Sequence, residues 1–413
     1  MAGTANFQFN HIYKYYQYYN AIIKSGGNKK VIKQMFPEMS VDEDIDPSQY
    51  AIIQLPYDKL PLGMMDQKIL EQGKATMDKQ IFMMENGAVF PADSEGFYLA
   101  SVINKATCPV TVNGQQYIFG ALLQGDRQKI YVMGVDPASE SDNFAVCIVE
   151  MDDAIGRVVY QWTTNRKKFE ADKRDGLVEE GIEDYNTYCV KYLRQLLKRF
   201  NISLICMDAG GGGLWVKEGF KDPKKMLPGD NLIQDMDEEG PATGEKILKM
   251  IQFSDSVWRK EAHWGLKKDL MDRLILFPYY DGADIELESI NKSSNNSFPD
   301  TLSDNYDEIL QLKTEMTFIR YNQTTNAQES WDIPKLKGVN AEAIKKTLKK
   351  DRFTSLLLAN WARRLVIDSR GGPSPYINNS YGGVSKELTN KSQGVYQSVS
   401  IKNYSGGNRR ICY

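Results

Sequence analysis

The chain has 413 residues, of which 42% are hydrophobic and 25% are charged, so its composition is that of a globular protein with about two or three structural units. Its formal net charge of -3 excludes a globally basic surface, and any DNA-binding surface must therefore be local. No segment approaches the roughly 20 apolar residues of a membrane span, and the N-terminus lacks the apolar core of a signal peptide, so we expect a soluble intracellular protein.

The cysteine and histidine content narrows the chemistry. The five cysteines are odd in number and form no CxxC pair, which is typical of a reducing compartment rather than of a disulfide framework. The two histidines, His11 and His263, are too few for histidine-based zinc sites or catalytic triads. If the chain binds metal, carboxylates must supply the ligands, and this favours hard cations such as Mg²⁺ or Mn²⁺.

Residues 1–125 form the first predicted region. Its pattern predicts an aromatic helix at 11–24, a short strand at 50–57 and two short helices with a turn between them at 60–90. Asp66 is the expected N-cap of the first helix of this pair.

Residues 126–370 form the second predicted region and contain the clearest strand patterns. Three apolar segments with short connections predict an antiparallel meander, at 129–138, 143–151 and 157–165. An amphipathic helix is expected at 183–200 and a fourth strand at 202–208. This β-β-β-α-β order predicts a mixed α/β sheet in which the first and fourth strands are neighbours.

The remainder of the chain is more polar. We expect mainly helix over 244–277, an exposed loop over 290–305, a helix running into a strand over 308–322, and a last strong helix over 341–365. Residues 371–413 are rich in Gly, Ser and Asn, and their five basic residues and one acidic residue give a net charge of +4. This composition predicts a flexible basic tail.

Three aspartates are the candidate catalytic and metal-binding residues. Asp136 ends the first strand, Asp208 ends the fourth, and Asp351 opens the last helix. Clustered carboxylates repel each other unless a divalent cation neutralises them. Two Mg²⁺ or Mn²⁺ ions about 4 Å apart can activate water and stabilise the leaving oxygen in phosphodiester cleavage. The glycines at 210–213 would let the backbone approach a phosphate closely.

Each aspartate also has a structural explanation. An aspartate after a strand, such as Asp136 before Pro137, is a common turn former. Asp351 is placed to cap its helix by accepting a backbone N–H from the next residues. The metal-site prediction therefore depends on all three residues occurring in order on the right elements.

Two basic groups are candidate DNA contacts. The first would share one face of a continuous helix and consists of Lys345, Lys349 and Arg352. The second follows the third strand and consists of Arg166, Lys167 and Lys168. Such side chains could track a DNA backbone, although a solvated helix face explains each of them equally well.

These segments together resemble the large terminase subunit of tailed phages, from about residue 6 to residue 366. In the second region the matching stretches are VMGVDPASESDNFAVCIVE, VVYQWTTNRKKF, LICMDAGGGGLWV, MIQFSDSVWRKEAHWGLKKDLMDRLILFP, EILQLKTEMTFI and DRFTSLLLANW. Upstream they are FNHIYKYYQYY and LPLGMMDQKILEQGKATMDKQIFMMENGAVFPADSEGFY. The motifs are short, and their order and spacing make the match specific.

The resemblance implies an RNase H-like nuclease domain that cuts concatemeric phage DNA, preceded by a remnant of the terminase motor and its linker. Asp136, Asp208 and Asp351 match the metal-binding acidic triad by motif, and Asp142 could assist a metal or shape the turn. The implied partners are double-stranded DNA, a separate packaging ATPase or motor fragment, the portal protein and the small terminase subunit. The implied location is the host cytoplasm, transiently at the procapsid portal.

One departure from the family pattern limits what is expected. The ATP-binding motif G-x-x-x-x-G-K-[ST] is absent, so we expect no ATPase activity from this chain alone. The motor is then a separate polypeptide or a missing part of an interrupted gene. Two alternatives stay open: another RNase H-like nuclease, such as a junction resolvase or transposase, and a non-catalytic module whose first region docks a packaging ATPase.

Overall fold

The computed structural model describes residues 3–5, 7–8, 10–37, 43–61, 63–76, 79–91, 94, 96–137, 142–239, 244–280, 282, 300–323, 329–334 and 348–370. The chain divides into two compact units, 1–119 with 313–349 and 120–312 with 350–413. The first boundary lies close to the predicted one at residue 125. Residues 313–349, however, group with the first unit, whereas the sequence indicated the second region. The predicted tail, 371–413, lies outside the described residues.

The first unit is mostly helical. Its elements are α1 (His11–Ser25), α2 (Lys29–Met35), the 3₁₀ turns η1 (Pro47–Gln49) and η2 (Tyr57–Lys59), α3 (Gln67–Thr76), α4 (Lys79–Glu85), α5 (Ala100–Lys105), the hairpin β1 (Val110–Val112) and β2 (Gln115–Tyr117), and the hairpin β10 (Arg320–Gln323) and β11 (Glu329–Asp332). The aromatic helix and the pair of short helices are confirmed, and Asp66 accepts a hydrogen bond from the Lys68 N–H at 2.8 Å, as expected of a cap.

The strand predicted at 50–57 is wrong. Residues 51–56 are neither helix nor strand, and Ile53 is 80% exposed. An apolar segment forms a strand only where another strand pairs with it, and within the described ranges none pairs with this one.

A seven-stranded mixed sheet forms the centre of the second unit. Its strands are β3 (Ile130–Asp136), β4 (Phe144–Asp152), β5 (Ile155–Thr164), β6 (Ile202–Asp208), β7 (Ile233–Asp235), β8 (Glu245–Ile251) and β9 (Ile275–Leu276), in the spatial order β7-β8-β6-β3-β4-β5-β9. Strands β3, β4 and β5 form the predicted antiparallel meander, and β6 and β8 continue the sheet in parallel beside β3. This is the RNase H-like arrangement, and the prediction that strands 1 and 4 are neighbours is confirmed.

The helices of this unit are α6 (Arg166–Arg174), α7 (Tyr185–Arg199), α8 (Gly213–Lys221), α9 (Ser256–Met271), α11 (Leu302–Phe318, which continues into the first unit) and α13 (Asp351–Ser369), with a 3₁₀ turn η3 (Pro223–Lys225). The helical prediction over 244–277 is confirmed only for α9. Residues Glu245–Ile251 form β8 instead, because pairing with β6 supplies the ladder that the local pattern could not reveal. No helix in the described ranges has both the length and the apolar character needed to span a membrane.

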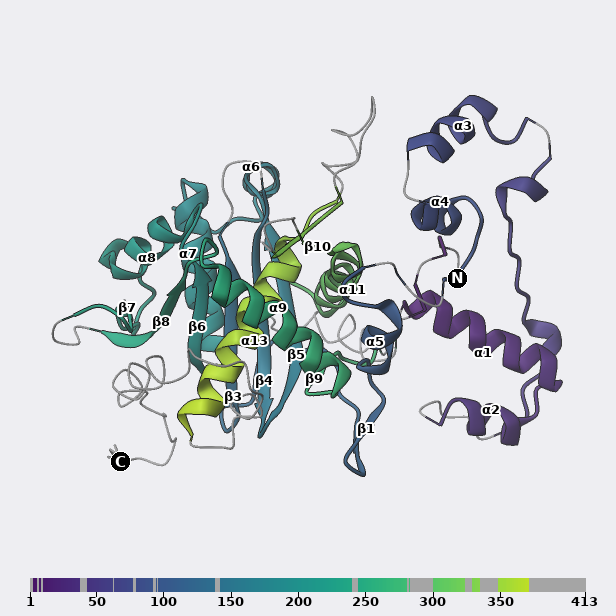
Figure 1. Ribbon diagram of the computed structural model, residues 1–413, viewed down its shortest axis with the longest axis horizontal. Helices are drawn as coiled ribbons and strands as arrows, with labels where there is room; N and C mark the ends of the chain where they lie inside the picture. Colours follow the sequence, from purple (N-terminus) through teal and green to yellow (C-terminus); the bar gives the residue numbers. More distant parts are fainter. Residues whose placement is uncertain are drawn as a thin grey trace. The chain divides into compact units, whose positions relative to one another are not determined.

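Helices cover both faces of the sheet. Figure 1 shows α9 and α13 crossing in front of it, and α13 packs on β3, β4 and β6. On the opposite face Trp162 of β5 stacks on Tyr192 of α7, with 3.9 Å between the ring centroids. Strand β3 is therefore buried from both sides, which explains its almost continuous apolar sequence.

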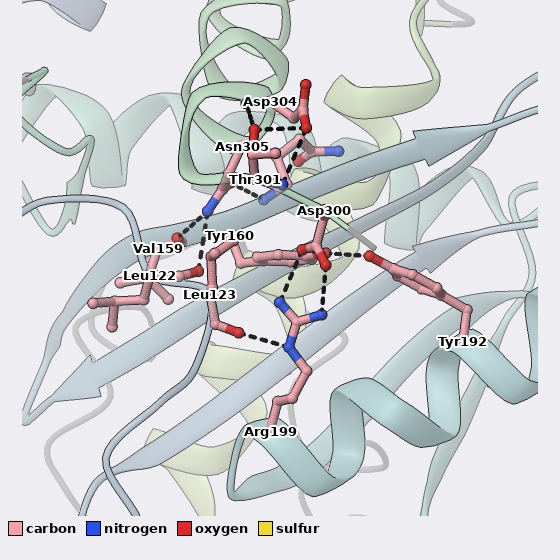
Figure 2. Close-up of polar contacts among 11 residues, drawn as sticks. Leu122, Leu123, Val159, Tyr160, Tyr192, Arg199, Asp300, Thr301, Asp304 and Asn305 are labelled. Atoms are coloured by element: carbon pink, nitrogen blue, oxygen red, sulfur yellow. Dashed lines mark hydrogen bonds and ion pairs between the residues drawn. The ribbon is translucent and has the colours of Figure 1, made fainter. Parts of the chain in front are cut away.

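The start of α11 is fixed by a buried polar network (Figure 2). Asp300 accepts two hydrogen bonds from the Arg199 guanidinium, at 2.9 and 2.8 Å, and one from the Tyr160 hydroxyl at 2.6 Å. Asn305 donates to the carbonyls of Leu122 and Val159. The exposed loop predicted at 290–305 is thus wrong for 300–305, because these polar side chains satisfy one another inside the fold. Residues 290–299 lie outside the described residues.

Candidate functional site

Two of the predicted aspartates end neighbouring parallel strands. Val135 of β3 pairs with Met207 of β6, so the next residue on each strand, Asp136 and Asp208, lies at the same edge of the sheet. Side chains at paired positions of neighbouring strands project from the same face. The fold therefore brings these two carboxylates side by side, although 72 residues of numbering separate them.

Helix α13 approaches this edge unusually closely. Gly134, two residues before Asp136, lies directly beneath the backbone of Ser355 and Ala359. Its partners across the sheet, Cys147 and Cys206, are also small, and this row of residues provides a shallow seat for the helix. A larger residue at position 134 would hold the helix away from the sheet.

This close packing places the first turn of α13 over the edge of the sheet at which Asp136 and Asp208 lie, which we call the aspartate edge. The Thr354 hydroxyl donates to the Lys350 carbonyl at 2.9 Å and also lies within hydrogen-bonding reach of the Asp136 carboxyl, whose pKa it lowers. Asp351 is 8% exposed, and its Oδ2 accepts the backbone N–H of Asn143 at 3.0 Å. The expectation that Asp351 caps its own helix is wrong, because Lys350 is the N-cap residue and its side chain makes no capping bond. The Asp351 carboxylate instead turns toward the β3–β4 connection.

The electrostatics of the site indicate mutual repulsion. Burial, followed by the charges of Asp351 and then Asp208, raises the pKa of Asp136 well above its usual value. The hydrogen bond from Thr354 and the charge of Lys350 lower the pKa of the same group but do not compensate. Burial also raises the pKa of Asp208, against a hydrogen bond from the Gly210 N–H at 2.9 Å.

The donor set suits a hard divalent cation, since it consists of carboxylate oxygens that repel one another in the absence of such an ion. A closed cage is not preformed: in the part of the chain that the structure describes, no three His, Cys, Asp or Glu side chains are arranged to hold a metal. An ion would therefore require the carboxylates to turn toward it or to bind it through water.

The glycines after Asp208 have a structural explanation. A Cβ on Gly213 would collide with the backbone carbonyl of Asp208, so the sharp turn from β6 into α8 requires a glycine there. Gly211 has a positive φ of 53°, which other residues rarely adopt. The Gly210 N–H already serves Asp208. The phosphate cradle expected at 210–213 stays a prediction.

The two basic groups have different environments. Arg166, Lys167 and Lys168 are exposed at the start of α6, directly after β5. Their N-cap residue Asn165 donates to the Asn143 side chain at 3.0 Å, and Asn143 is the residue that holds Asp351. This group therefore lies at the aspartate edge of the sheet.

The other group does not form the predicted helix face. Residues 348–350 are not helical, so Lys349 and Arg352 do not lie on one continuous helix, and Lys345 lies outside the described residues. Arg352 is buried and ion-paired with Glu308 at 2.7 Å. Asp142 is exposed.

Sequence reasoning missed several residues that shape the site. Gly134, Asn143 and Thr354 were not identified, because each becomes informative only when α13 is placed on β3. Gly134 carried one signal that could have been used, since a lone glycine inside an apolar strand often marks a close backbone approach. His263 is buried against Phe353; burial and the charges of Lys350 and Arg259 lower its pKa to about 3, so it is neutral.

No protein-family model and no curated protein matches the chain. Among solved structures, the large terminase nuclease of thermophilic phage G20c matches with a TM-score of 0.33 and 10% identity over 59% of this chain and 92% of that chain. The large terminase nuclease domain of Thermus phage P74-26 matches with 0.32 and 11% over 59% and 88%. The large terminase of bacteriophage HK97 matches with 0.32 and 10% over 58% and 40%.

Proposed function

We propose that this chain is a metal-dependent DNA endonuclease of a phage packaging terminase, and that Asp136, Asp208 and Asp351 are its catalytic metal ligands. The observation that supports the proposal is that Asp136 and Asp208 end neighbouring strands at one edge of the sheet, and that Asp351, from a distant segment, acts on Asp136 by its charge. Burial and then the charges of Asp351 and Asp208 raise the pKa of Asp136, and a divalent cation would favour the ionised carboxylates at this place.

Each group of side chains at this edge would have a separate role in cleavage. The three carboxylates would hold one or two Mg²⁺ or Mn²⁺ ions, which supply an activated water and charge stabilisation for phosphodiester cleavage. Thr354 and Asn143 would keep Asp136 and Asp351 oriented toward the ions. Arg166 and Lys167, exposed at the same edge, would contact DNA phosphates and hold the duplex across the site.

In this proposal the chain acts on double-stranded concatemeric DNA in the host cytoplasm, transiently at the procapsid portal. A separate packaging ATPase or motor fragment, the portal protein and the small terminase subunit are its partners. The support is the order of sequence motifs along both units, since the nuclease site alone does not distinguish a terminase from other RNase H-like nucleases.

The test is nicking of supercoiled plasmid with Mg²⁺ or Mn²⁺. The wild-type chain should convert the plasmid to open circles and linear DNA with little sequence preference, and Asp136→Ala should abolish this conversion. Asp272→Ala is the matched control, because Asp272 is a half-exposed aspartate at the end of α9, paired with Lys268. Equal cleavage by wild type and Asp136→Ala would refute the site, and preference for branched DNA would favour a resolvase-type nuclease.

A second candidate is a non-catalytic module that docks a packaging ATPase. It is favoured by the lack of a preformed three-residue metal cage within the described ranges. Calorimetry with Mn²⁺ separates the two functions. Binding that Asp136→Ala removes supports the nuclease, and no binding together with tight association with a packaging ATPase supports the docking module.

A further inference from the structure

The helix that carries Asp351 begins without a capping side chain. Its N-cap residue, Lys350, makes no side-chain hydrogen bond to the first turn. The first N–H groups of a helix have no partner within the helix, so the position of the first turn depends on contacts with other segments. Asp351 is in that turn, and a metal ligand there needs another means of support.

A closed polar network supplies that support from outside the helix. The Arg352 guanidinium donates two hydrogen bonds to the Glu308 carboxylate of α11, from Nε at 2.7 Å and from Nη2 at 3.2 Å. The same Nη2 donates to the Thr163 hydroxyl at 3.2 Å, and this hydroxyl donates to Glu308 at 2.7 Å. Each of the three side chains thus contacts both of the others.

The network is anchored in the row of the sheet that contains Asp136. Thr163 of β5 pairs with Ala145 of β4, and Ala145 pairs with Asp136 of β3. Paired residues project from the same face, so Thr163 lies on the face that carries Asp136, two strands away. Arg352, the residue after Asp351, therefore contacts the same row of the sheet in which Asp136 lies.

The network is also shielded from water. Arg352 is 9% exposed and the Glu308 side chain is 18% exposed. Charge-assisted, two-point arginine–carboxylate pairs have defined geometry, and burial strengthens them. Such a pair can fix the rotation and height of a helical turn, which a solvent-exposed ion pair cannot do.

We infer that Glu308 and Arg352 are positioning residues that hold Asp351 in reach of the cation shared with Asp136 and Asp208. This inference rests on the proposed function. It assigns Arg352 a role inside the protein instead of a contact with DNA. Glu308 acts through Arg352, and neither side chain touches the ion.

The experiment compares Glu308→Gln and Arg352→Lys with Glu150→Gln in the full chain. Glu150 is the matched control, because it is a buried carboxylate of the same sheet, paired with Lys129 and Arg157. It pairs in register with Tyr131, near the end of β3 opposite Asp136. Mn²⁺ affinity is measured by calorimetry or electron paramagnetic resonance, with the thermal midpoint and the plasmid-nicking rate recorded on the same samples.

Both network variants should weaken Mn²⁺ binding by about tenfold or more, as is usual for groups that orient a metal ligand, and should slow nicking in parallel. Glu150→Gln should lower the thermal midpoint but leave Mn²⁺ affinity within about twofold of wild type, because it lies remote from the ligands. Metal loss in Glu308→Gln alone would make Glu308 a ligand and overturn the positioning role. Wild-type Mn²⁺ affinity in both variants, or equal weakening in Glu150→Gln, would also overturn it.

The two proposals fail in different ways. A wild-type chain that binds Mn²⁺ and nicks DNA, with network variants that behave identically, leaves the nuclease assignment intact and removes the positioning role. A wild-type chain that neither binds Mn²⁺ nor nicks DNA overturns both.

Discussion

Replacing Gly134 with alanine tests the seat of α13 on the sheet. A Cβ at this position would lie far inside van der Waals contact with the Ser355 carbonyl oxygen and the Ala359 nitrogen, and 3.0 Å from the Ala359 Cα. All three are backbone atoms. No side chain can rotate to relieve the collision, so the helix itself must move away from β3.

The cost follows from this contact. Extra methyl groups in a well-packed core destabilise by about 1–3 kcal/mol, and we expect the upper end because backbone must shift. For a domain of about 200 residues this corresponds to a loss of about 6–12 °C in the thermal midpoint. Asp351 moves with the helix, and a misplacement of about 1 Å at a reacting centre can reduce the rate by about 100-fold.

The assay measures plasmid nicking and Mn²⁺ affinity well below the thermal midpoint of the variant. Gly156→Ala is the matched control: its Cβ would meet the side chains of Arg363, Ile275 and Val149 at 2.7–2.8 Å, on the same sheet but remote from the aspartates. Side chains and not backbone would have to shift here, so stability should fall less than in Gly134→Ala and nicking should not change. Gly134→Ala with wild-type nicking and stability would refute the close seating. Equal loss of nicking in both variants would show general destabilisation instead.

Four further predictions concern charge. The raised pKa of Asp136 means that above a pH of about 4 the metal-free native state binds more protons than the unfolded state, so the free energy of unfolding falls as the pH rises. Asp136→Asn should remove this contribution, which thermal melts between about pH 4 and 8 would measure. Mn²⁺ at about 100 times its Kd should stabilise the wild-type chain by about 2.7 kcal/mol, reversibly with EDTA, and should leave the thermal midpoint of Asp136→Asn unchanged. The double variant Arg166→Ala, Lys167→Ala should reduce the steepness with which log DNA affinity falls against log salt concentration by about 2, as measured by fluorescence anisotropy in EDTA. An unchanged slope would show that these residues do not contact DNA. Asp269 is fully buried between two arginines of α13. Asp269→Asn should therefore lower the free energy of unfolding, measured in urea, by about 3–5 kcal/mol. A decrease below about 1 kcal/mol would contradict its role in joining α9 to α13.

The sequence by itself determined the local elements of the second unit. The apolar segments β3 to β6 and the amphipathic helix α7 are encoded by residue periodicity, which acts over neighbouring positions. The order of these elements was sufficient to predict that Asp136 and Asp208 end adjacent strands. Both conclusions depend only on contacts that are short in sequence or fixed by the topology of a sheet.

Only the tertiary structure determined how α13 packs on the sheet and which of its side chains lie at the site. Its approach depends on Gly134, Cys147 and Cys206 forming one row across three strands, and no local pattern reveals that row. The same packing decides between the two explanations of Asp351, because its carboxylate accepts the Asn143 N–H and acts on Asp136 instead of capping its helix. It also makes Arg352, an expected DNA contact, the partner of Glu308. The physical reason is that a side chain's role is set by what lies against it, and here those neighbours come from segments far apart in the chain.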